Sequence, residues 1–213
     1  MELISDELAA YVEAHTSPES EVLTELNRET NAHVLMPRML SGHLQGQLLS
    51  MLSHMIQPEQ VLEIGTYTGY SAICLAAGLK KGGCIHTIDI NDELAPMVQR
   101  YIAKAGLSES IKTYIGNARE VIPSINETFD LVFIDADKIN YSRYYDLVFD
   151  KVRKGGYLIA DNVLWSGKVL ESESAMDADT RGITRFNKKV HEDMRVHHIL
   201  LPVRDGLMVM RKI

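Results

Sequence analysis

The spacing of hydrophobic and polar residues changes once along the chain, close to residue 59. Before that point most apolar residues recur three or four positions apart, which places them on one face of a helix. The residues of this face are Leu44, Leu48, Met51, Leu52 and Met55. Further upstream, Ser17-Pro18-Glu19 combines an N-cap residue with a first-turn proline and acid, which predicts the start of a helix. Residues 1–58 are therefore expected to form helices.

From residue 59 onward, short apolar runs alternate with helical stretches. The runs are Val61–Ile64, Cys84–Ile88, Ile111–Ile115, Leu131–Ile134 and Tyr157–Ala160. One of the helical stretches, Asp92–Ala105, is followed by Gly106, a typical C-cap residue. Strands that are apolar on both faces and separated by helices indicate a parallel sheet that is covered on both sides. We expect residues 59–213 to be the α/β core of a single domain spanning residues 1–213.

The C-terminal part of the chain departs from this alternation. A predicted helix near Asp179–Arg195 is followed by two more apolar runs, His197–Leu201 and Leu207–Met210, joined only by residues 202–206. A parallel crossover needs about a dozen residues, so these two strands must pair as an antiparallel hairpin. The predicted fold class is therefore α/β, with a doubly wound, mostly parallel, Rossmann-like sheet of seven strands that ends in this hairpin.

Composition narrows the protein class without naming a function. The chain has 213 residues with 46% hydrophobic and 24% charged residues, which suits one folded domain. It contains no apolar run near the roughly 18 residues of a membrane span and no signal-peptide pattern, so we expect a cytoplasmic protein. Cys74 and Cys84 form no metal or redox motif and are expected to be reduced core residues. The net charge of −7 disfavours nucleic-acid binding, although composition alone does not exclude a local basic patch.

The first strand-to-helix turn, residues 63–71, reads Glu-Ile-Gly-Thr-Tyr-Thr-Gly-Tyr-Ser and predicts a cofactor site. Ligands of open α/β sheets bind beyond the carboxyl ends of the strands, where this turn lies. Tyr67 occupies the second glycine position of the dinucleotide fingerprint, which argues against a pyrophosphate. Glu63 would repel phosphates but suits the ammonium and sulfonium of S-adenosylmethionine, and Asp89 could accept ribose hydroxyls. The alternative is a generic turn with a helix-capping acid.

Oxygen-bearing residues follow the fourth and fifth predicted strands. Asp135 and Asp137 come directly after the fourth, and Asp161-Asn162 after the fifth. Two carboxylates and an amide carbonyl make an all-oxygen set that suits Mg²⁺ and leaves positions for water and substrate. Taken singly, these residues could instead cap a helix or form an Asx turn. Their occurrence together, beside the glycine turn, favours a metal site.

The sequence resembles the cation-dependent O-methyltransferases, the family that includes catechol and caffeoyl-coenzyme A O-methyltransferases. The resemblance runs from about Met39 to the end of the chain. It is carried by residues 61–71, Thr87-Ile88-Asp89, residues 133–138 and residues 161–167. It implies a methyltransferase fold in which Asp135, Asp161 and Asn162 bind a divalent cation, Mg²⁺ or else Mn²⁺ or Ca²⁺. The residues it assigns to S-adenosylmethionine are Met39, Ser41, Glu63, Gly65, Thr66, Tyr67, Ser71, Asp89, Ala118 and Asp135.

The resemblance also implies a catalytic residue, Lys138, at the position of the proposed general base of catechol O-methyltransferases. A phenol has a pKa near 10, so little of it is nucleophilic at neutral pH. A divalent cation stabilises the phenolate as a Lewis acid, and a lysine beside a cation loses its proton more readily. The alternative is an ordinary exposed lysine. We expect transfer of a methyl group from S-adenosylmethionine to a phenolic or catechol-type hydroxyl of a small molecule.

The acceptor is less well defined by the sequence. Trp165 could form an aromatic wall of the substrate site or pack at the sheet edge, and Asp205 could contact substrate or belong to a plain Asp-Gly turn. The chain departs from the catechol branch at Pro202, where that branch has a substrate-binding glutamate. Methylation of hydroxyuridine in tRNA and a non-catalytic S-adenosylmethionine-binding module are the alternative functions. The resemblance further implies a homodimer, to which the helices before about Gly42 contribute.

Overall fold

The computed structural model describes residues 4–213, which fall into two compact units. We call Ile4–Asn117 the N-terminal unit and Ala118–Ile213 the C-terminal unit, and describe each by itself. Whether the two make up the single domain expected from the sequence stays a prediction. Between residues 4 and 213 no helix combines the length and the apolar character that crossing a membrane requires.

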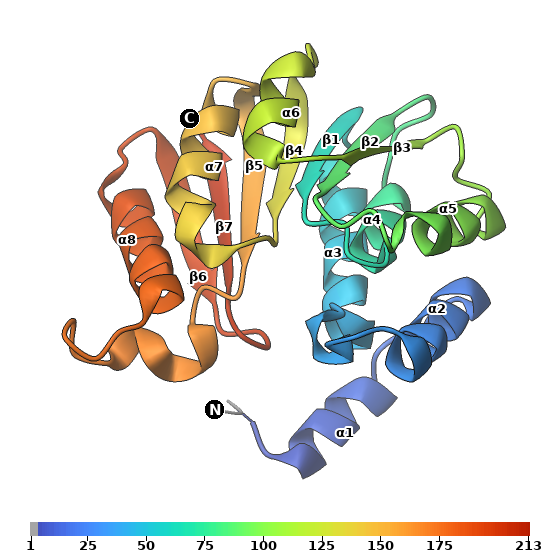
Figure 1. The fold of residues 1–213 in the computed structure, drawn as a ribbon, viewed down its shortest axis with the longest axis horizontal. Helices are drawn as coiled ribbons and strands as arrows, with labels where there is room; N and C mark the ends of the chain where they lie inside the picture. Colours follow the sequence, from blue (N-terminus) through green and yellow to red (C-terminus); the bar gives the residue numbers. More distant parts are fainter. Residues whose placement is uncertain (1–3) are drawn as a thin grey trace. The chain divides into compact units, whose positions relative to one another are not determined.

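The N-terminal unit carries helices followed by three strands that alternate with further helices (Figure 1). Strand β1 pairs in parallel with β2, and β2 pairs in parallel with β3. The elements are α1 (Asp6–Ala14), α2 (Glu21–His33), η1 (Pro37–Met39), α3 (Gly42–Ile56), β1 (Gln60–Ile64), α4 (Tyr70–Ala76), β2 (Cys84–Asp89), α5 (Ala95–Lys104) and β3 (Ile111–Ile115). Cys74 and Cys84 are buried free thiols, as predicted.

The start of α2 differs from the sequence prediction. Its N-cap is Ser20, whose hydroxyl accepts a hydrogen bond from the Leu23 amide at 3.4 Å, so the helix begins beyond Ser17-Pro18-Glu19. The predicted start is wrong because the backbone of residues 17 and 18 has other partners. The Ser17 carbonyl lies 2.6 Å from Nε2 of His43, and the Pro18 carbonyl accepts a hydrogen bond from Gln47 at 3.1 Å.

Close packing joins α3 to α4 in the N-terminal unit. Ser53 of α3 donates a hydrogen bond to the Leu75 carbonyl at 2.6 Å. Gly78, just beyond α4, lies against the backbone of α3, and a Cβ atom added to it would stand 2.1 Å from the Ser53 carbonyl carbon. Backbone atoms cannot give way as a flexible side chain can. This contact therefore requires glycine at position 78.

The C-terminal unit contains parallel strands followed by the hairpin. Strand β4 pairs in parallel with β5, and β7 lies between β5 and β6, antiparallel to both. Helices α7 and α8 pack against each other over these strands (Figure 1). The elements are α6 (Ala118–Ser124), β4 (Phe129–Ile134), η2 (Lys138–Asn140), α7 (Tyr141–Phe149), β5 (Val152–Asp161), η3 (Trp165–Leu170), α8 (Ala178–Glu192), β6 (Val196–Leu201) and β7 (Leu207–Lys212).

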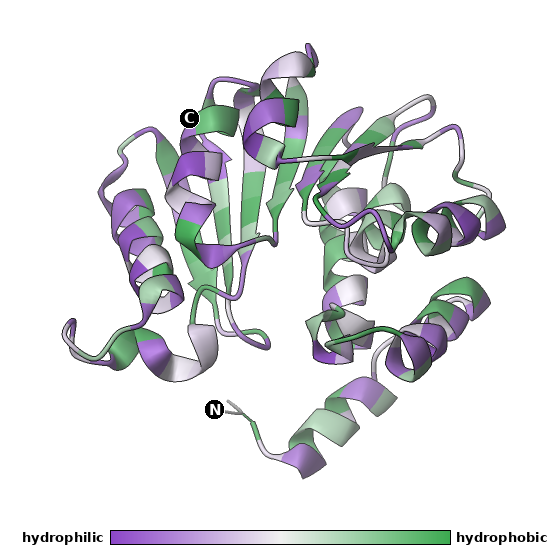
Figure 2. Ribbon diagram, in the orientation of Figure 1, coloured by the Kyte–Doolittle hydropathy of each residue, from purple (hydrophilic) through white to green (hydrophobic). Residues whose placement is uncertain are grey.

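The distribution of hydropathy explains why this unit folds as it does. Figure 2 shows hydrophobic residues along the strands of the C-terminal unit, and α7 and α8 carry hydrophilic residues on part of their surface. Val132, Phe133 and Ile159 are fully buried in the sheet. Seven strands in residues 4–213, mostly parallel and ending in the antiparallel hairpin, confirm the fold class predicted from the sequence.

We predict that Gly78→Ala lowers the free energy of unfolding by about 3 kcal/mol, the upper end of the usual cost of overpacking. The new methyl group would clash with the backbone of α3 at residues 53 and 54. Urea unfolding of the purified variant measures the change. Ala77→Ser, at the exposed neighbouring position, is the control and should change stability by less than about 0.5 kcal/mol. Equal stability of Gly78→Ala and wild type would contradict the close packing.

Candidate active site

The carboxyl ends of β1 and β2 meet at one edge of the N-terminal unit. The register pairs Ile64 with Ile88, so the next residues, Gly65 and Asp89, lie side by side. The Gly65 amide donates a hydrogen bond to the Ile88 carbonyl at 2.9 Å, which continues the pairing beyond the strand ends. The turn after β1 and the acid that ends β2 therefore form one feature of the surface, as the parallel topology requires.

The turn after β1 contains three residues in the left-handed region. Gly65 and Gly69 have φ of 103° and 88°, and Tyr67 has φ of 49°. Glycine adopts such angles at little cost, whereas a tyrosine there is strained and must be held by its surroundings. The Tyr67 hydroxyl donates to the Leu35 and Met36 carbonyls, both at 3.3 Å. The Tyr67 side chain is partly buried, and this burial raises its pKa.

Asp89 is fixed by backbone amides on both of its carboxylate oxygens. Oδ2 accepts a hydrogen bond from the Tyr67 amide at 2.7 Å, and Oδ1 accepts one from the Asn91 amide at 2.9 Å. A carboxylate offers about four lone-pair sites, so these two bonds leave acceptor capacity on each oxygen. The side chain is partly exposed. Asp89 is therefore an oriented acceptor that suits a pair of hydroxyl groups.

Glu63 occupies a different environment, fully buried in β1. Its Oε2 accepts a hydrogen bond from the Thr87 hydroxyl at 2.5 Å, and that hydroxyl lies 2.5 Å from the hydroxyl of Thr66. This chain of contacts ties the glycine turn to the centre of the sheet. Among the other predicted cofactor residues, Ser41 and Ser71 are buried and Met39 is 56% exposed.

In the C-terminal unit, the carboxyl ends of β4 and β5 carry the predicted metal ligands. The register pairs Ile134 with Ala160, so Asp135 and Asp161 lie side by side just beyond them. Leu207, the first residue of β7, is paired with Asp161, which brings the turn of the hairpin to the same edge. The topology of this unit thus gathers Asp135, Asp161, Asn162 and Asp205 into one region.

Lys138 lies in the middle of this region and is only 7% exposed. Its ammonium donates hydrogen bonds to Oδ1 of Asp135 at 2.9 Å, to Oδ1 of Asn162 at 2.8 Å and to the Tyr141 hydroxyl at 2.6 Å. Three donors are thus matched by three acceptors, which is what a buried ammonium needs. The alternative of an ordinary exposed lysine is therefore wrong.

No role was assigned to Tyr141 from the sequence. It is fully buried, and its hydroxyl donates a hydrogen bond to the Asp161 carbonyl at 3.0 Å. Burial, with the nearby charges of Asp135 and Asp161, raises the pKa of Tyr141 well above its ordinary value. Its place three residues after Lys138, at the start of a helix, is the signal that could have drawn attention to it, since residues three apart share a face.

The three predicted metal ligands present oxygen atoms suited to a hard cation. Oδ1 of Asp135 and Oδ1 of Asn162 converge on one positive charge, the Lys138 ammonium. Asp161 is 3% exposed, and its Oδ1 accepts the Asn162 amide at 2.6 Å. Asn162 has φ of 58°, an angle that asparagine tolerates better than most residues. Within residues 4–213 no cluster of three or more His, Cys, Asp or Glu side chains could hold a metal. A metal bound by this set would therefore need the side-chain amide oxygen of Asn162 as its third ligand.

Trp165 and Asp205 lie in two neighbouring segments of the same region. The Trp165 ring centroid is 5.7 Å from Nζ of Lys138, and Trp165 has φ of 50°. The Asp205 carboxylate accepts a hydrogen bond from the Ser166 amide at 2.5 Å, and its carbonyl accepts one from the Leu164 amide at 2.9 Å. Asp205 thus holds the segment that carries Trp165. This contact gives Asp205 a structural role whether or not it also contacts substrate.

Three further residues complete the description of this unit. Gly182 of α8 lies against the Lys138 backbone, and a Cβ atom added to it would stand 2.6 Å from the Lys138 carbonyl oxygen. An isolated glycine inside a predicted helix was the sequence signal for this close approach. Asp137 accepts hydrogen bonds from Tyr144 and Asn140, which ties η2 to α7. Ala118, a predicted cofactor residue, is buried at the start of α6.

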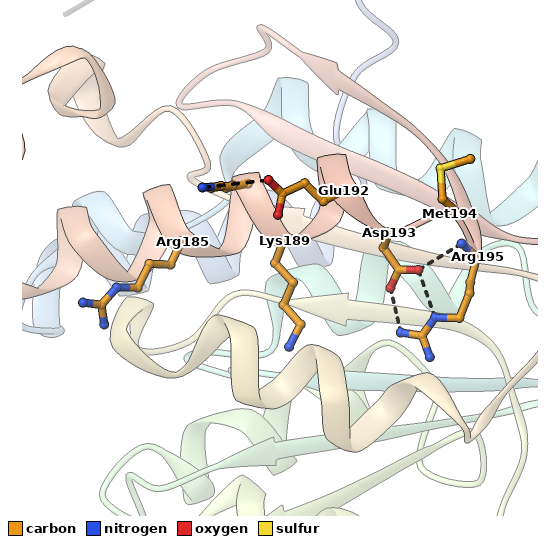
Figure 3. Close-up of a pocket in the computed structure, with 7 residues that line it drawn as sticks. Arg185, Lys189, Glu192, Asp193, Met194 and Arg195 are labelled. Carbon is orange, nitrogen blue, oxygen red and sulfur yellow. Dashed lines mark hydrogen bonds and ion pairs between the residues drawn. The ribbon is translucent and has the colours of Figure 1, made fainter.

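A separate hollow lies at the C-terminal end of α8 (Figure 3). Arg195 donates hydrogen bonds to both carboxylate oxygens of Asp193, at 2.9 and 2.7 Å, and these hold the pKa of Asp193 well below its usual range. Lys189 pairs with Asp146 at 2.5 Å. Of the described residues that line this hollow, none is a predicted site residue. The predicted site residues at the strand ends are thus separate from this hollow.

Comparison with known proteins agrees with the geometry. A family model described as O-methyltransferase matches residues 13–213. The caffeoyl-CoA O-methyltransferase of Petroselinum crispum is 37% identical over 227 residues, covering 99% of this chain and 92% of the relative. The solved O-methyltransferase of Bacillus cereus, in complex with SAH, has a TM-score of 0.90 and 30% identity over 97% of each chain. The O-methyltransferase TomG of Streptomyces achromogenes, in complex with SAM, has a TM-score of 0.88 and 26% identity over 97% of this chain and 96% of its own.

Proposed function

The chain belongs to the O-methyltransferase family, and we propose that it transfers the methyl group of S-adenosylmethionine to a phenolic or catechol-type hydroxyl of a small molecule, assisted by a divalent cation. Membership confirms the resemblance seen in the motifs and identifies the protein as an enzyme. The observation that carries the finer proposal is the buried Lys138, held by Asp135 and Asn162 at the carboxyl ends of two parallel strands. A non-catalytic binding module is therefore set aside.

S-adenosylmethionine fits the edge of the N-terminal unit on chemical grounds. The solved relatives of this family that bind SAH and SAM support the same cofactor here. Asp89 has acceptor capacity for the two ribose hydroxyls, and the left-handed Tyr67 departs from a pyrophosphate-binding turn. The residues that we propose to bind it are Met39, Ser41, Glu63, Gly65, Thr66, Tyr67, Ser71, Asp89, Ala118 and Asp135.

A divalent cation fits the edge of the C-terminal unit. Asp135, Asp161 and Asn162 would supply hard oxygen ligands, which Mg²⁺ prefers, with Mn²⁺ and Ca²⁺ as alternatives. When bound, such a cation supplies Lewis-acid stabilisation of a phenolate oxygen and fixes its direction. The contacts of Asp135 and Asn162 with the Lys138 ammonium support this assignment, because oxygens that accept from one positively charged group are also suited to a neighbouring cation.

Lys138 is the proposed general base. Its nitrogen takes the phenolic proton, the phenolate oxygen forms a bond to the methyl carbon, and the carbon–sulfur bond breaks to leave S-adenosylhomocysteine. The lysine has to be neutral before it accepts the proton, so the step begins with the amine form. Because Nζ is held by three oxygen atoms at 2.9 Å or less, the residue is placed before substrate arrives.

The acceptor is proposed to be a small phenol on grounds of the site and of net charge. Trp165 lies near Lys138 and could flank a planar ring, while Asp205 fixes the segment of Trp165. A net charge of −7 disfavours tRNA as the acceptor.

We also propose a homodimer to which the helices before Gly42 contribute. Leu8 and Tyr11 of α1 are exposed apolar residues that a partner would cover. The cytoplasmic location stays a prediction.

We predict that methyl transfer requires a divalent cation and favours phenols. Purified protein is assayed with S-adenosylmethionine and, in parallel, a catechol, caffeoyl-coenzyme A and tRNA, with and without a chelator. Activity with a phenolic acceptor should disappear with chelator and return on addition of Mg²⁺ or Mn²⁺. Full turnover in metal-free buffer would contradict the cation proposal, and turnover of tRNA alone would contradict the phenol proposal.

The assignment of Asp89 predicts a loss of cofactor affinity. Asp89→Ala should weaken S-adenosylmethionine binding by about 1.5–3 kcal/mol, the usual range for hydrogen bonds to a charged group. Isothermal titration calorimetry measures the change. Asp92→Ala, an exposed aspartate in the same loop, is the matched control and should bind as wild type does. Unchanged affinity of Asp89→Ala would remove the ribose assignment.

Lys138→Ala should lower kcat by roughly 10²–10⁴-fold, the usual range for a positioned acid–base group. The affinity for S-adenosylmethionine should hardly change. The defect should shrink with acceptors of lower phenolic pKa, because these need less help in losing their proton. Steady-state kinetics with a series of substituted catechols measure both effects, with Lys188→Ala on the exposed face of α8 as the control. A variant with wild-type kcat across the series would show that Lys138 is not the base.

A further inference from the structure

We propose that Tyr141 is a positioning residue for Lys138, and that its hydroxyl fixes the lysine nitrogen at the point where the phenolic proton is removed. This inference rests on the proposed role of Lys138 as general base. The role of Tyr141 does not come from a motif. It follows instead from the contacts of its hydroxyl, from the burial of its ring and from the packing of α8 on the turn that carries Lys138.

The Tyr141 hydroxyl bridges the lysine and the backbone of β5. Nζ of Lys138 donates to it at 2.6 Å, the shortest of the three hydrogen bonds of that nitrogen. The lysine ammonium has no acceptor, so the hydroxyl directs its single proton elsewhere, and it donates to the Asp161 carbonyl at 3.0 Å. The oxygen that holds Lys138 is thus itself fixed to the last residue of a central strand.

The ring of Tyr141 cannot move without disturbing the core. It is fully buried and packs edge-on against Phe186 of α8, with ring centroids 5.5 Å apart and an interplanar angle of 90°. Such a pair is a favourable aromatic geometry. By contrast, the side chain of Asp135 keeps 21% of its surface exposed, and Asn162 is also partly exposed. Tyr141 is therefore the most rigid of the three acceptors.

The main chain of Lys138 is fixed from another side. Gly182 of α8 lies so close to the Lys138 carbonyl that only a residue without a Cβ atom fits there. The lysine is thus held at its backbone by α8 and at its nitrogen by the first residue of α7. A lysine side chain has four rotatable bonds, so holding both of its ends removes much of its conformational freedom.

The division of acceptors gives Tyr141 a separate task. Asp135 and Asn162 are also the residues proposed to bind a cation, and an oxygen that serves a cation is a poorer partner for an ammonium. Tyr141 is the one acceptor of Lys138 that carries no other proposed ligand role. It therefore maintains the position of the nitrogen independently of the ligand set.

The test is a double-mutant cycle of Tyr141→Phe and Lys138→Ala, which separates positioning from a general structural effect. Tyr141→Phe should lower kcat by roughly 10- to 100-fold, as expected for a misplaced catalytic group, with KM for S-adenosylmethionine unchanged. In the Lys138→Ala background the same change should cause no further loss. Tyr145→Phe is the matched control, because Tyr145 also lies in α7 and is fully buried, and its hydroxyl donates a hydrogen bond only to Asp193. This control variant should keep wild-type kcat.

A second readout does not depend on activity. Thermal unfolding of wild type, both single variants and the double variant should show non-additive losses of stability, because each single variant removes the same hydrogen bond. Three results would each overturn the positioning role alone. The first is an equal loss of kcat from Tyr141→Phe in both backgrounds, and the second is additive losses of stability. The third is wild-type kcat in Tyr141→Phe while Lys138→Ala is impaired. Wild-type kcat in Lys138→Ala would instead remove the proposed general base, and the inference with it.

Discussion

A buried ammonium determines the organisation of the C-terminal unit's edge. A charge removed from water is tolerated only where each of its donors meets an acceptor, and Lys138 meets three. Those acceptors come from the end of β4, the end of β5 and the first turn of α7. The register that pairs Ile134 with Ala160 is what brings the first two together. The Lys138 ammonium thus makes the positions of three separate elements depend on one another.

The features that sequence patterns predicted well are those with a strong local signal. Strands β1 to β5 each contain a short run rich in apolar residues, and the short connection between β6 and β7 allowed only a hairpin. The predicted boundaries differed from the observed ones where they depend on distant partners. The start of α2 is set by side chains of α3 that occupy the preceding backbone, and β5 begins at Val152, upstream of its apolar run.

For the site, sequence patterns identified residue types but not how they are held. The strand ends predicted the grouping of Asp135, Asp161 and Asn162, because parallel strands place their carboxyl ends at one edge. The burial of Lys138 could not be predicted, since it requires α8 to approach the lysine through Gly182, 44 residues away in the chain. Tyr141 was missed for the same reason: its hydroxyl acts through tertiary contacts that no local pattern encodes.

The place of β7 between β5 and β6 inverts the order in which this part of the sheet is synthesised. When β6 leaves the ribosome it has no partner, because the strand that joins it to β5 is synthesised after it. Until residues 207–212 are available, the edge of β5 is unpaired and apolar, and such edges promote aggregation. A nascent chain therefore completes the edge that carries Asp161 only after residues 207–212 have been synthesised, and chains stalled or cleaved before β7 would be substrates for chaperones and proteases.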